Sequence, residues 1–324
     1  MSVQWGVLST ARINDKFLAG VAQSTECDVL AVASRDAARA AEYARERGIE
    51  RTYGGYEQLL ADDDIEAIYI SLPNSLHLEW TQRALRAGKH VLCEKPLSRR
   101  ESDVEAAFDV AESADRRLME AFMWRHNPQT ARVLELVAAG AIGALRIVRA
   151  SFSFAIGDDD GGNVRLSAEL EGGALMDVGC YCVSAARLLA GEPDSVSGQQ
   201  LIGGDGIDVA FAGSMHFDSG VLAHFDAGIA LAARDELEVV GDEASLFLDD
   251  PWHCRQPAIE LRRDGAVERI VLEPADSYRL EAENLSAAIR GHGQPLLGRA
   301  DAVGQARAIE ALYASARTGP RTAS

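Results

Sequence analysis

The chain has 324 residues, 47% of them hydrophobic and 25% charged, and carries a formal net charge of −18. This length allows one large domain or two of ordinary size, and the composition is typical of a soluble globular protein. The charge argues against nucleic acid and anionic membranes as partners, because both would repel the chain. We find no apolar run of the ~18 residues that a membrane helix needs, and no basic and apolar leader typical of secretion.

The chain up to Met123 alternates between short apolar strands and helices. The expected strands are 3–9, 27–34, 65–72, 90–93 and 117–123, and the expected helices are 12–24, 37–47, 56–60, 76–87 and 98–114. Strands that are apolar throughout and alternate with helices indicate a parallel sheet covered on both faces. We therefore expect an α/β domain over residues 1–124, with the doubly wound sheet of a Rossmann fold.

The pattern changes after this point, where strands begin to follow one another across short turns. A helix over 129–139, a strand over 145–154, a polar loop over 157–163 and a helix over 173–189 come first. The later strands are 195–201, 207–217, 221–229, 236–240, 244–248, 259–263 and 266–272, followed by helices 277–290 and 300–317. Such runs predict an α+β domain over 125–324 with a mostly antiparallel, open-faced sheet. Its last helix could pack back on the first domain.

The first expected strand leads into a turn that resembles a dinucleotide-binding turn without its glycines. The three glycine places of G-x-G-x-x-G hold Ser9, Ala11 and Asn14. Such a loop needs a tight turn, a close backbone approach to pyrophosphate and a helix N-terminus aimed at the charge. Hydroxyl groups here can donate to phosphate oxygens, although a strand-turn-helix without a ligand remains the alternative. The candidate cofactor contacts are Ser9, Thr10, Ala11, Arg12 and Ile13.

The second expected strand ends in Ser34, Arg35 and Asp36. This strand end contacts the adenine ribose in dinucleotide folds. An acidic residue there binds a 2′-hydroxyl group, whereas an arginine pairs with a 2′-phosphate. Ser34 and Arg35 therefore favour NADP over NAD, with a solvated arginine at a helix start as the alternative.

Three further stretches resemble the Gfo/Idh/MocA family, which includes glucose–fructose oxidoreductase, dimeric dihydrodiol dehydrogenase and NADP-dependent D-xylose dehydrogenases. They are Leu72-Pro73-Asn74-Ser75-Leu76-His77, Cys93-Glu94-Lys95-Pro96-Leu97, and Gly172-Gly173-Ala174-Leu175-Met176-Asp177-Val178-Gly179-Cys180-Tyr181. The resemblance implies a Rossmann domain for the cofactor. It also implies a second domain whose helical face forms the substrate cleft and whose open sheet face builds a homodimer or a dimer of dimers.

The resemblance assigns the catalytic roles to Lys95, Asp177 and Tyr181. Asp177 and Tyr181 lie four apart on one expected helix and hence on one face. Hydride transfer from a carbinol carbon needs a base for the hydroxyl proton, and this role falls to Tyr181. A free tyrosine has a pKa of about 10, so Lys95 would lower the pKa and hydrogen-bond the substrate oxygen. Asp177 would orient the substrate through a neighbouring hydroxyl group.

Further residues are site candidates because they lie in the family's motifs. His77 either contacts the cofactor or caps its helix, and Glu94 either holds its loop or lines the ribose. Arg125 and Asn127 face substrate or are structural. Arg165 contacts cofactor or substrate. Leu72, Pro73 and Asn74 complete the expected cofactor contacts. For Phe152, Phe154 and Trp252, core packing is favoured over a place in the pocket wall.

The five cysteines are Cys27, Cys93, Cys180, Cys182 and Cys254. Their odd number and wide spacing indicate reduced thiols in a cytoplasmic protein. No Cys/His spacing indicates zinc, so we expect no metal.

These observations together predict an NADP-dependent oxidoreductase acting on a cyclic sugar or polyol. The favoured reaction is that of an aldose 1-dehydrogenase of the D-xylose or D-glucose type. Within the enzymes, a trans-dihydrodiol dehydrogenase or a ketosugar reductase is the alternative. A non-catalytic NADP-binding regulatory protein is the alternative of another class, and the intact Lys95, Asp177 and Tyr181 argue against it.

Overall fold

The computed structural model describes residues 2–157 and 162–318, and these divide into two compact units. The first unit is Met1–Met123 with Asp276–Val303, and the second is Trp124–Ala275 with Gly304–Ser324. The first division thus falls one residue before the expected boundary. Asp276–Val303 belongs to the first unit, and the second division falls inside the last helix. No described helix is long and apolar enough to cross a membrane.

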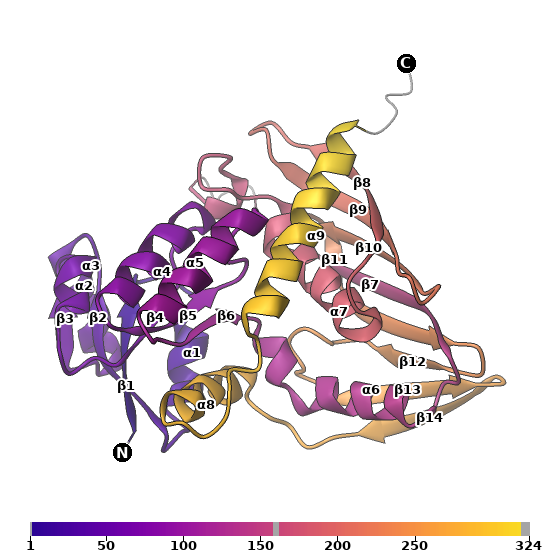
Figure 1. Ribbon diagram of the computed structural model, residues 1–324, viewed down its shortest axis with the longest axis horizontal. Helices are drawn as coiled ribbons and strands as arrows, with labels where there is room; N and C mark the ends of the chain where they lie inside the picture. The colour runs from indigo at the N-terminus through magenta and orange to yellow at the C-terminus, as the bar shows by residue number, and fades with distance from the viewer. Residues whose placement is uncertain (1, 158–161, 319–324) are drawn as a thin grey trace. The chain divides into compact units, whose positions relative to one another are not determined.

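The first unit contains a six-stranded parallel sheet in the order β3-β2-β1-β4-β5-β6 (Figure 1). Its strands are β1 (Val3–Leu8), β2 (Cys27–Ala33), β3 (Arg51–Tyr53), β4 (Ala67–Ile70), β5 (His90–Glu94) and β6 (Leu118–Ala121). Its helices are α1 (Asn14–Val21), α2 (Ala37–Arg47), α3 (Tyr56–Leu60), α4 (His77–Arg86), α5 (Glu101–Ser113) and α8 (Ser277–Ile289). The strand order reverses between β1 and β4, as in a Rossmann sheet. The expectation of a doubly wound sheet is confirmed.

The short edge strand β3 was not predicted from the sequence. Its three residues, Arg51–Tyr53, include no fully buried side chain. An edge strand this short carries no hydrophobic pattern, and only its pairing with β2 reveals it.

Helix α8 belongs to the first unit because it covers α1 and the sheet. Gly20 of α1 lies against the backbone of Arg279, where a side chain would clash. The indole Nε1 of Trp5 donates to Ser286 Oγ of α8 at 3.3 Å. Trp5 also packs edge-on against Phe17, which stacks on Tyr69 at 4.0 Å. These rings form the centre of the core beside β1 and β4.

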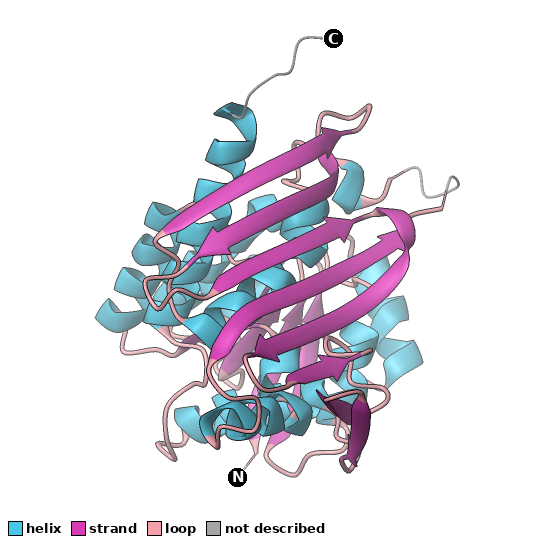
Figure 2. Ribbon diagram, turned by 90° about the vertical axis from the view of Figure 1, so that its right-hand side faces the viewer, coloured by secondary structure: helices cyan, strands magenta, loops and turns pink. Residues whose placement is uncertain are grey.

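The second unit contains an eight-stranded sheet in the order β14-β13-β12-β11-β7-β10-β9-β8, seen face-on in Figure 2. All neighbouring strands are antiparallel except β7 and β10. The strands are β7 (Leu145–Ala155), β8 (Ser195–Ile202), β9 (Asp208–His216), β10 (Leu222–Gly228), β11 (Ala230–Gly241), β12 (Ser245–Leu248), β13 (Ala258–Arg263) and β14 (Ala266–Val271). The helices are α6 (Pro128–Ala138), α7 (Cys180–Ala190) and most of α9 (Arg299–Thr318). The expected α+β domain with a mostly antiparallel sheet is confirmed.

One strand of this sheet differs clearly from expectation. β11 begins at Ala230 rather than at Glu236. Its pairing with β7 shifts register between Ala230 and Arg234, so its side chains do not alternate regularly there. The alternating pattern that predicts a strand is therefore lost over its first residues.

The two faces of the second sheet differ in burial. Along β10, Ala223, Phe225 and Ala227 are buried, whereas Leu222 and His224 are exposed. Helix α7 packs on β7 and β10 on the buried side. No described helix of this unit crosses the other face, which Figure 2 turns toward the viewer. The expected loop over 157–163 lies mostly outside the described residues, since 158–161 are not among them.

Candidate active site

The glycine-poor turn after β1 adopts a conformation that glycine would normally supply. Ser9 has a φ of 118°, which is unusual for a residue with a side chain. The Ala11 N–H donates to Ser9 Oγ at 3.1 Å, and Asn14 Nδ2 donates to the Ser9 carbonyl oxygen at 2.9 Å. The Ser9 hydroxyl also lies 2.8 Å from that of Ser71. The residues at the three glycine places are thus joined by hydrogen bonds, which offset the backbone strain at Ser9.

The start of α1 is suited to an anion. The helix begins at Asn14 after Ile13, and no side chain caps its N-terminus. Thr10, Ala11 and Ile13 are half-buried in the preceding turn, and Arg12 is exposed. The N–H groups of Asn14, Asp15 and Lys16 donate to carbonyl oxygens of the preceding turn, so the helix dipole is what favours a phosphate here.

Two arginines, Arg35 and Arg39, follow β2. The Asp36 carboxylate accepts the N–H groups of Ala38 and Arg39 at 2.9 and 3.1 Å, so it is used as the cap of α2. Burial raises the pKa of Tyr56, and the guanidinium groups of Arg35 and Arg39 act against this rise. Both guanidinium groups therefore lie near one phenol. Sequence reasoning missed Arg39, although its position four residues after Arg35 was a usable signal.

Three side chains from three elements hold the loop that carries Lys95. Tyr69 of β4 donates to Glu94 Oε1 at 2.5 Å, and Glu120 of β6 accepts the Leu97 N–H at 2.7 Å. The His77 ring at the start of α4 contacts the Pro96 carbonyl oxygen through Nδ1 at 2.9 Å. Lys95 thus projects from a fixed backbone. Glu120 was missed, although a glutamate inside an apolar strand signals a specific partner.

The contacts of this loop favour one of the two roles that the sequence allows for His77 and for Glu94. His77 is 1% exposed, and its second nitrogen, Nε2, lies 2.7 Å from the Leu72 carbonyl oxygen. Burial lowers the pKa of His77, so the neutral ring donates to one of these two carbonyl oxygens. Its buried position between them favours the structural role over a cofactor contact. Glu94 holds its own loop, because it accepts from Tyr69 and from the Lys95 N–H. Pro73 and Asn74 are half-buried between β4 and α4.

The Gly172-Gly173 pair in the second unit positions the segment that carries Asp177. Gly173 has a φ of 123°, and a side chain there would collide with Asp208. The buried Asp208 carboxylate accepts the Leu175 N–H at 2.7 Å and the Tyr313 hydroxyl at 2.9 Å. The expected helix over 173–189 therefore starts at this anchor. It begins as a π-helical turn, Leu175–Gly179, and continues as α7.

Asp177 is paired with a residue that the sequence also singled out. Arg165 Nε donates to Asp177 Oδ2 at 2.7 Å. The Asp177 side chain is 14% exposed and that of Arg165 is 45% exposed. The structure thus brings Arg165 together with Asp177, and the ion pair orients the carboxylate.

Tyr181 lies in a group of aromatic rings. Its ring centroid is 5.3 Å from that of Phe152 and 5.9 Å from that of Trp252. Trp252 also packs edge-on against Trp124 at 5.3 Å. Phe152 and Trp252 are buried, as core packing predicts, and they fix the orientation of the Tyr181 ring. We call Phe152, Tyr181 and Trp252 the aromatic cluster.

Arg125 and Asn127 differ in their surroundings. The Asn127 side chain is 1% exposed and accepts the Gln129 N–H at 2.9 Å, so it caps α6. This favours the structural alternative for Asn127. Arg125 is half-buried, lies over the Trp124 ring and reaches Ser184 Oγ at 3.4 Å.

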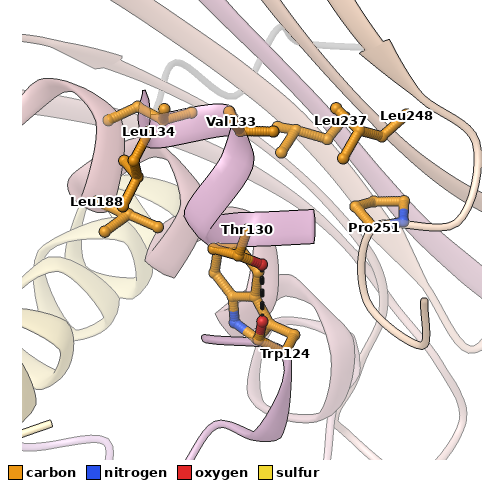
Figure 3. Close-up of a pocket in the computed structure, with 9 residues that line it drawn as sticks. Trp124, Thr130, Val133, Leu134, Leu188, Leu237, Leu248 and Pro251 are labelled. Atoms are coloured by element: carbon orange, nitrogen blue, oxygen red, sulfur yellow. Dashed lines mark hydrogen bonds between the residues drawn. The ribbon is translucent and has the colours of Figure 1, made fainter. Parts of the chain in front are cut away.

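An apolar cavity lies beside these residues between α6, α7 and β11 (Figure 3). The Thr130 hydroxyl on its wall donates to the Trp124 carbonyl oxygen at 2.7 Å. The cavity contains none of the candidate catalytic side chains, so we interpret it as a packing gap in the core. Its lining residues are Trp124, Thr130, Val133, Leu134, Leu188, Leu189, Leu237, Leu248 and Pro251.

One group among the described residues has the composition of a metal site. Ligand atoms of Asp235, Asp250 and His253 lie within 4.8 Å of one another. However, the Arg255 guanidinium donates to both carboxylates, at 3.3 Å to Asp235 and 2.9 Å to Asp250. An arginine thus already neutralises the charge that a cation would neutralise.

Two family models match most of the chain. Residues 3–122 match the family of oxidoreductases with an NAD-binding Rossmann fold, and residues 130–247 match the GFO/IDH/MocA C-terminal domain. The chain is 40% identical over 321 residues to D-xylose 1-dehydrogenase (NADP(+)) 2 of Haloferax volcanii, with 98% of each chain covered.

Two solved structures are similar over nearly the whole chain. A 3-ketoreductase from Actinomadura kijaniata, in complex with NADP and TDP-benzene, superimposes with a TM-score of 0.91 at 31% identity, covering 97% of this chain and 98% of that one. An aldose-aldose oxidoreductase from Caulobacter crescentus, complexed with glycerol, gives 0.91 at 27% identity, covering 99% of each. With the two units, the motifs and these matches, the chain belongs to the GFO/IDH/MocA family of oxidoreductases.

Proposed function

We propose that this protein transfers hydride between NADP and a carbinol carbon of a cyclic sugar, as an aldose 1-dehydrogenase. The observation that carries the proposal is the anchoring of the loop around Lys95, in which Tyr69, His77 and Glu120 hold Glu94, Pro96 and Leu97. A backbone fixed on both sides of one lysine supports a defined task for that lysine. The similarity to a D-xylose 1-dehydrogenase supports an aldose as substrate.

The cofactor proposal rests on the first unit. The start of α1, which no side chain caps, would hold the pyrophosphate, with contacts from Ser9–Ile13. Ser34 and Arg35, joined by Arg39, would hold the 2′-phosphate. Asp36 caps α2 through Oδ1 alone. Leu72, Pro73 and Asn74 would follow the cofactor along the strand ends.

The chemistry needs a proton acceptor and a way to orient the sugar. NADP accepts the hydride when it is bound. Tyr181 takes the hydroxyl proton, and the Lys95 ammonium favours the ionised phenol and hydrogen-bonds the reacting oxygen. Asp177, oriented by Arg165, accepts from a neighbouring hydroxyl group. In the reverse direction Tyr181 donates the proton.

A second candidate is a ketosugar reductase, because the 3-ketoreductase structure matches over 97% of the chain. A trans-dihydrodiol dehydrogenase is a third, because the chain is 31% identical over 245 residues to the trans-1,2-dihydrobenzene-1,2-diol dehydrogenase of Xenopus laevis.

The test is absorbance at the reduced-nicotinamide band. Purified protein is mixed with NADP or NAD and a panel of pentoses, hexoses, inositols and a trans-dihydrodiol. A rise with NADP and one aldose supports the proposal. A rise only with the dihydrodiol would identify a trans-dihydrodiol dehydrogenase instead. If no substrate gives a rise but ketosugars oxidise NADPH, the protein is a ketosugar reductase instead.

We also propose a homodimer built through the open face of the second sheet, and a cytoplasmic location. The open face carries exposed Leu201, Leu222, Val267 and Val271. The five cysteines are all free and buried, which fits a reducing compartment.

A further inference from the structure

A polar pair lies at the edge of the aromatic cluster. The His253 ring packs edge-on against Phe152, with centroids 5.5 Å apart. His253 Nδ1 lies 2.9 Å from Asp235 Oδ2. Neither residue belongs to the family motifs in the sequence, and neither was a candidate there.

The register of the sheet places Asp235 on the same face as the cluster. Asp235 of β11 pairs directly with Phe152 of β7, and Leu237 pairs with Ala150. Paired residues point to the same face of a sheet. Leu237 and Ala150 are buried on the helix-covered face. Asp235 is therefore a carboxylate on the inner face, beside the ring that contacts Tyr181.

The loop that presents His253 is fixed from both ends. Asp250 accepts the N–H groups of Arg255 and Gln256 at 2.5 and 3.2 Å. The Trp252 N–H donates to Asp235 Oδ1 at 3.3 Å, and its indole donates to the Ser151 carbonyl oxygen at 3.1 Å. The backbone on each side of His253 is thus held before any ligand binds, which reduces the entropy cost of binding.

The hydrogen bond to Asp235 decides what the ring can offer. A neutral imidazole that donates from Nδ1 is an acceptor at Nε2. Nε2 has no hydrogen-bond partner among the described residues, and the side chain is 41% exposed. One exposed acceptor therefore lies on a ring that contacts Phe152, the same ring that contacts Tyr181, at centroid distances of 5.5 and 5.3 Å.

We propose that His253, oriented by Asp235, accepts a hydrogen bond from a sugar hydroxyl group remote from the reacting carbon, and so selects sugars over arene diols. The inference rests on the proposed function, because it takes Tyr181 as the proton acceptor. An apolar wall alone accommodates an arene ring equally well. A site that hydrogen-bonds a hydroxyl group discriminates strongly against analogues that lack it.

The test compares the preferred aldose with its set of monodeoxy analogues, using kcat/KM with NADP. His253→Phe keeps a ring against Phe152 and removes the acceptor. We expect it to lower kcat/KM for the aldose by about 10- to 100-fold, mainly through KM. One deoxy analogue should be unaffected, because it lacks the hydroxyl group that His253 would bind. His253→Gln, which keeps an acceptor, should restore part of the loss.

The control is His292→Phe. His292 is exposed and lies in the turn after α8, in the first unit. It should leave every kcat/KM unchanged. Thermal midpoints and NADP affinity should be unchanged in both variants.

Four outcomes overturn the inference. Sugar turnover that His253→Phe leaves unchanged overturns the inference alone, as does an equal loss for the aldose and all its deoxy analogues. Activity that a chelator abolishes and a divalent cation restores would make Asp235, Asp250 and His253 a metal site instead. Absence of sugar turnover by the unaltered protein overturns the proposed function, and the inference with it.

Discussion

Lys95 shows how a single residue depends on its supports. Its own neighbours in sequence, Glu94 and Pro96, are each bonded to a different element, through Tyr69 and His77. The motif around it was readable in the sequence. The side chains that fix its loop come from β4, α4 and β6, and the motif does not identify them.

Replacing Lys95 tests its catalytic role. Lys95→Ala removes the ammonium that would favour the ionised phenol of Tyr181, so kcat should fall by at least ~100-fold. NADP affinity should remain largely intact, as measured by fluorescence titration. Tyr181→Phe should cost a similar factor. Lys16→Ala, at an exposed position of α1, is the control and should leave kcat unchanged. A Lys95→Ala enzyme with normal turnover would exclude the proposed role.

The burial of Glu281 of α8 should have a measurable effect on the free energy of unfolding. It is fully buried, and neither carboxylate oxygen has a hydrogen-bond partner among the described residues. Burial raises its pKa well above the usual 4.5, and the nearby Glu94 raises it further. The folded protein therefore holds this proton where the unfolded chain releases it.

The sign of the pH dependence follows from this raised pKa. The contribution of Glu281 is fully present below pH 4.5 and is lost as pH rises toward the folded pKa. Within that window stability should fall by about 1.4 kcal/mol per pH unit from this group. Glu281→Gln should remove this slope and raise the thermal midpoint at pH 8 more than at pH 5. Glu283→Gln, on the same helix but half-exposed, should change neither. Identical slopes in the Glu281 variant and the parent would contradict the assignment.

At the scale of elements, the β1–α1 turn forms without the glycines of the usual G-x-G-x-x-G pattern. Glycines would allow its backbone conformation without strain. Here Ser9 adopts it at a φ of 118°, and hydrogen bonds to Ala11 and Asn14 hold it. The sequence raised the question of whether this is a cofactor turn, and the geometry supports that interpretation.

Asn14 gives a test of the turn. Asn14→Ala removes the hydrogen bond to the Ser9 carbonyl oxygen, which should loosen the turn without touching the reacting groups. We expect the Kd for NADP to rise about three- to tenfold with kcat unchanged. Gln23→Ala, beyond the exposed end of α1, should have no effect on cofactor affinity. A fall in kcat with an unchanged Kd for NADP would show that the turn does not act through cofactor binding.

For the whole molecule, the open face of the second sheet is the surface on which the dimer proposal rests. Arg149 of β7 pairs with Glu238 of β11 at 3.0 Å, and Arg262 of β13 lies over Phe247. Exposed apolar side chains from β8, β10 and β14 surround these charges. Such a mixture of ion pairs and apolar groups is typical of an interface.

Leu222 is the residue to change. It lies on β10 near the middle of the sheet and is 48% exposed. Leu222→Asp would bury a charge if this face is covered by a second copy, so the dimer should dissociate in light scattering coupled to size exclusion. Leu296→Asp, at a similarly exposed leucine of the first unit, should leave the mass unchanged. A parent protein that is monomeric at micromolar concentration would overturn the dimer.

The sequence by itself determined the elements, the two sheets and the residues of the family motifs. These follow from hydrophobic periodicity and from short, contiguous patterns, which are local properties of the chain. Among the described strands, β3 and the start of β11 were missed, because neither carries a regular local pattern. The short 3-10 turns Asn74–Leu76, Met123–His126 and Val164–Leu166 were not predicted either.

The tertiary structure alone decided which residues support the motifs. Glu120 meets Leu97, Asp208 meets Gly173, and Asp235 meets His253 across long stretches of chain. It also decided that α8 belongs with the first unit. Such contacts depend on how whole elements pack, and the free energy of packing is shared among many side chains at once. No short stretch of sequence therefore encodes them.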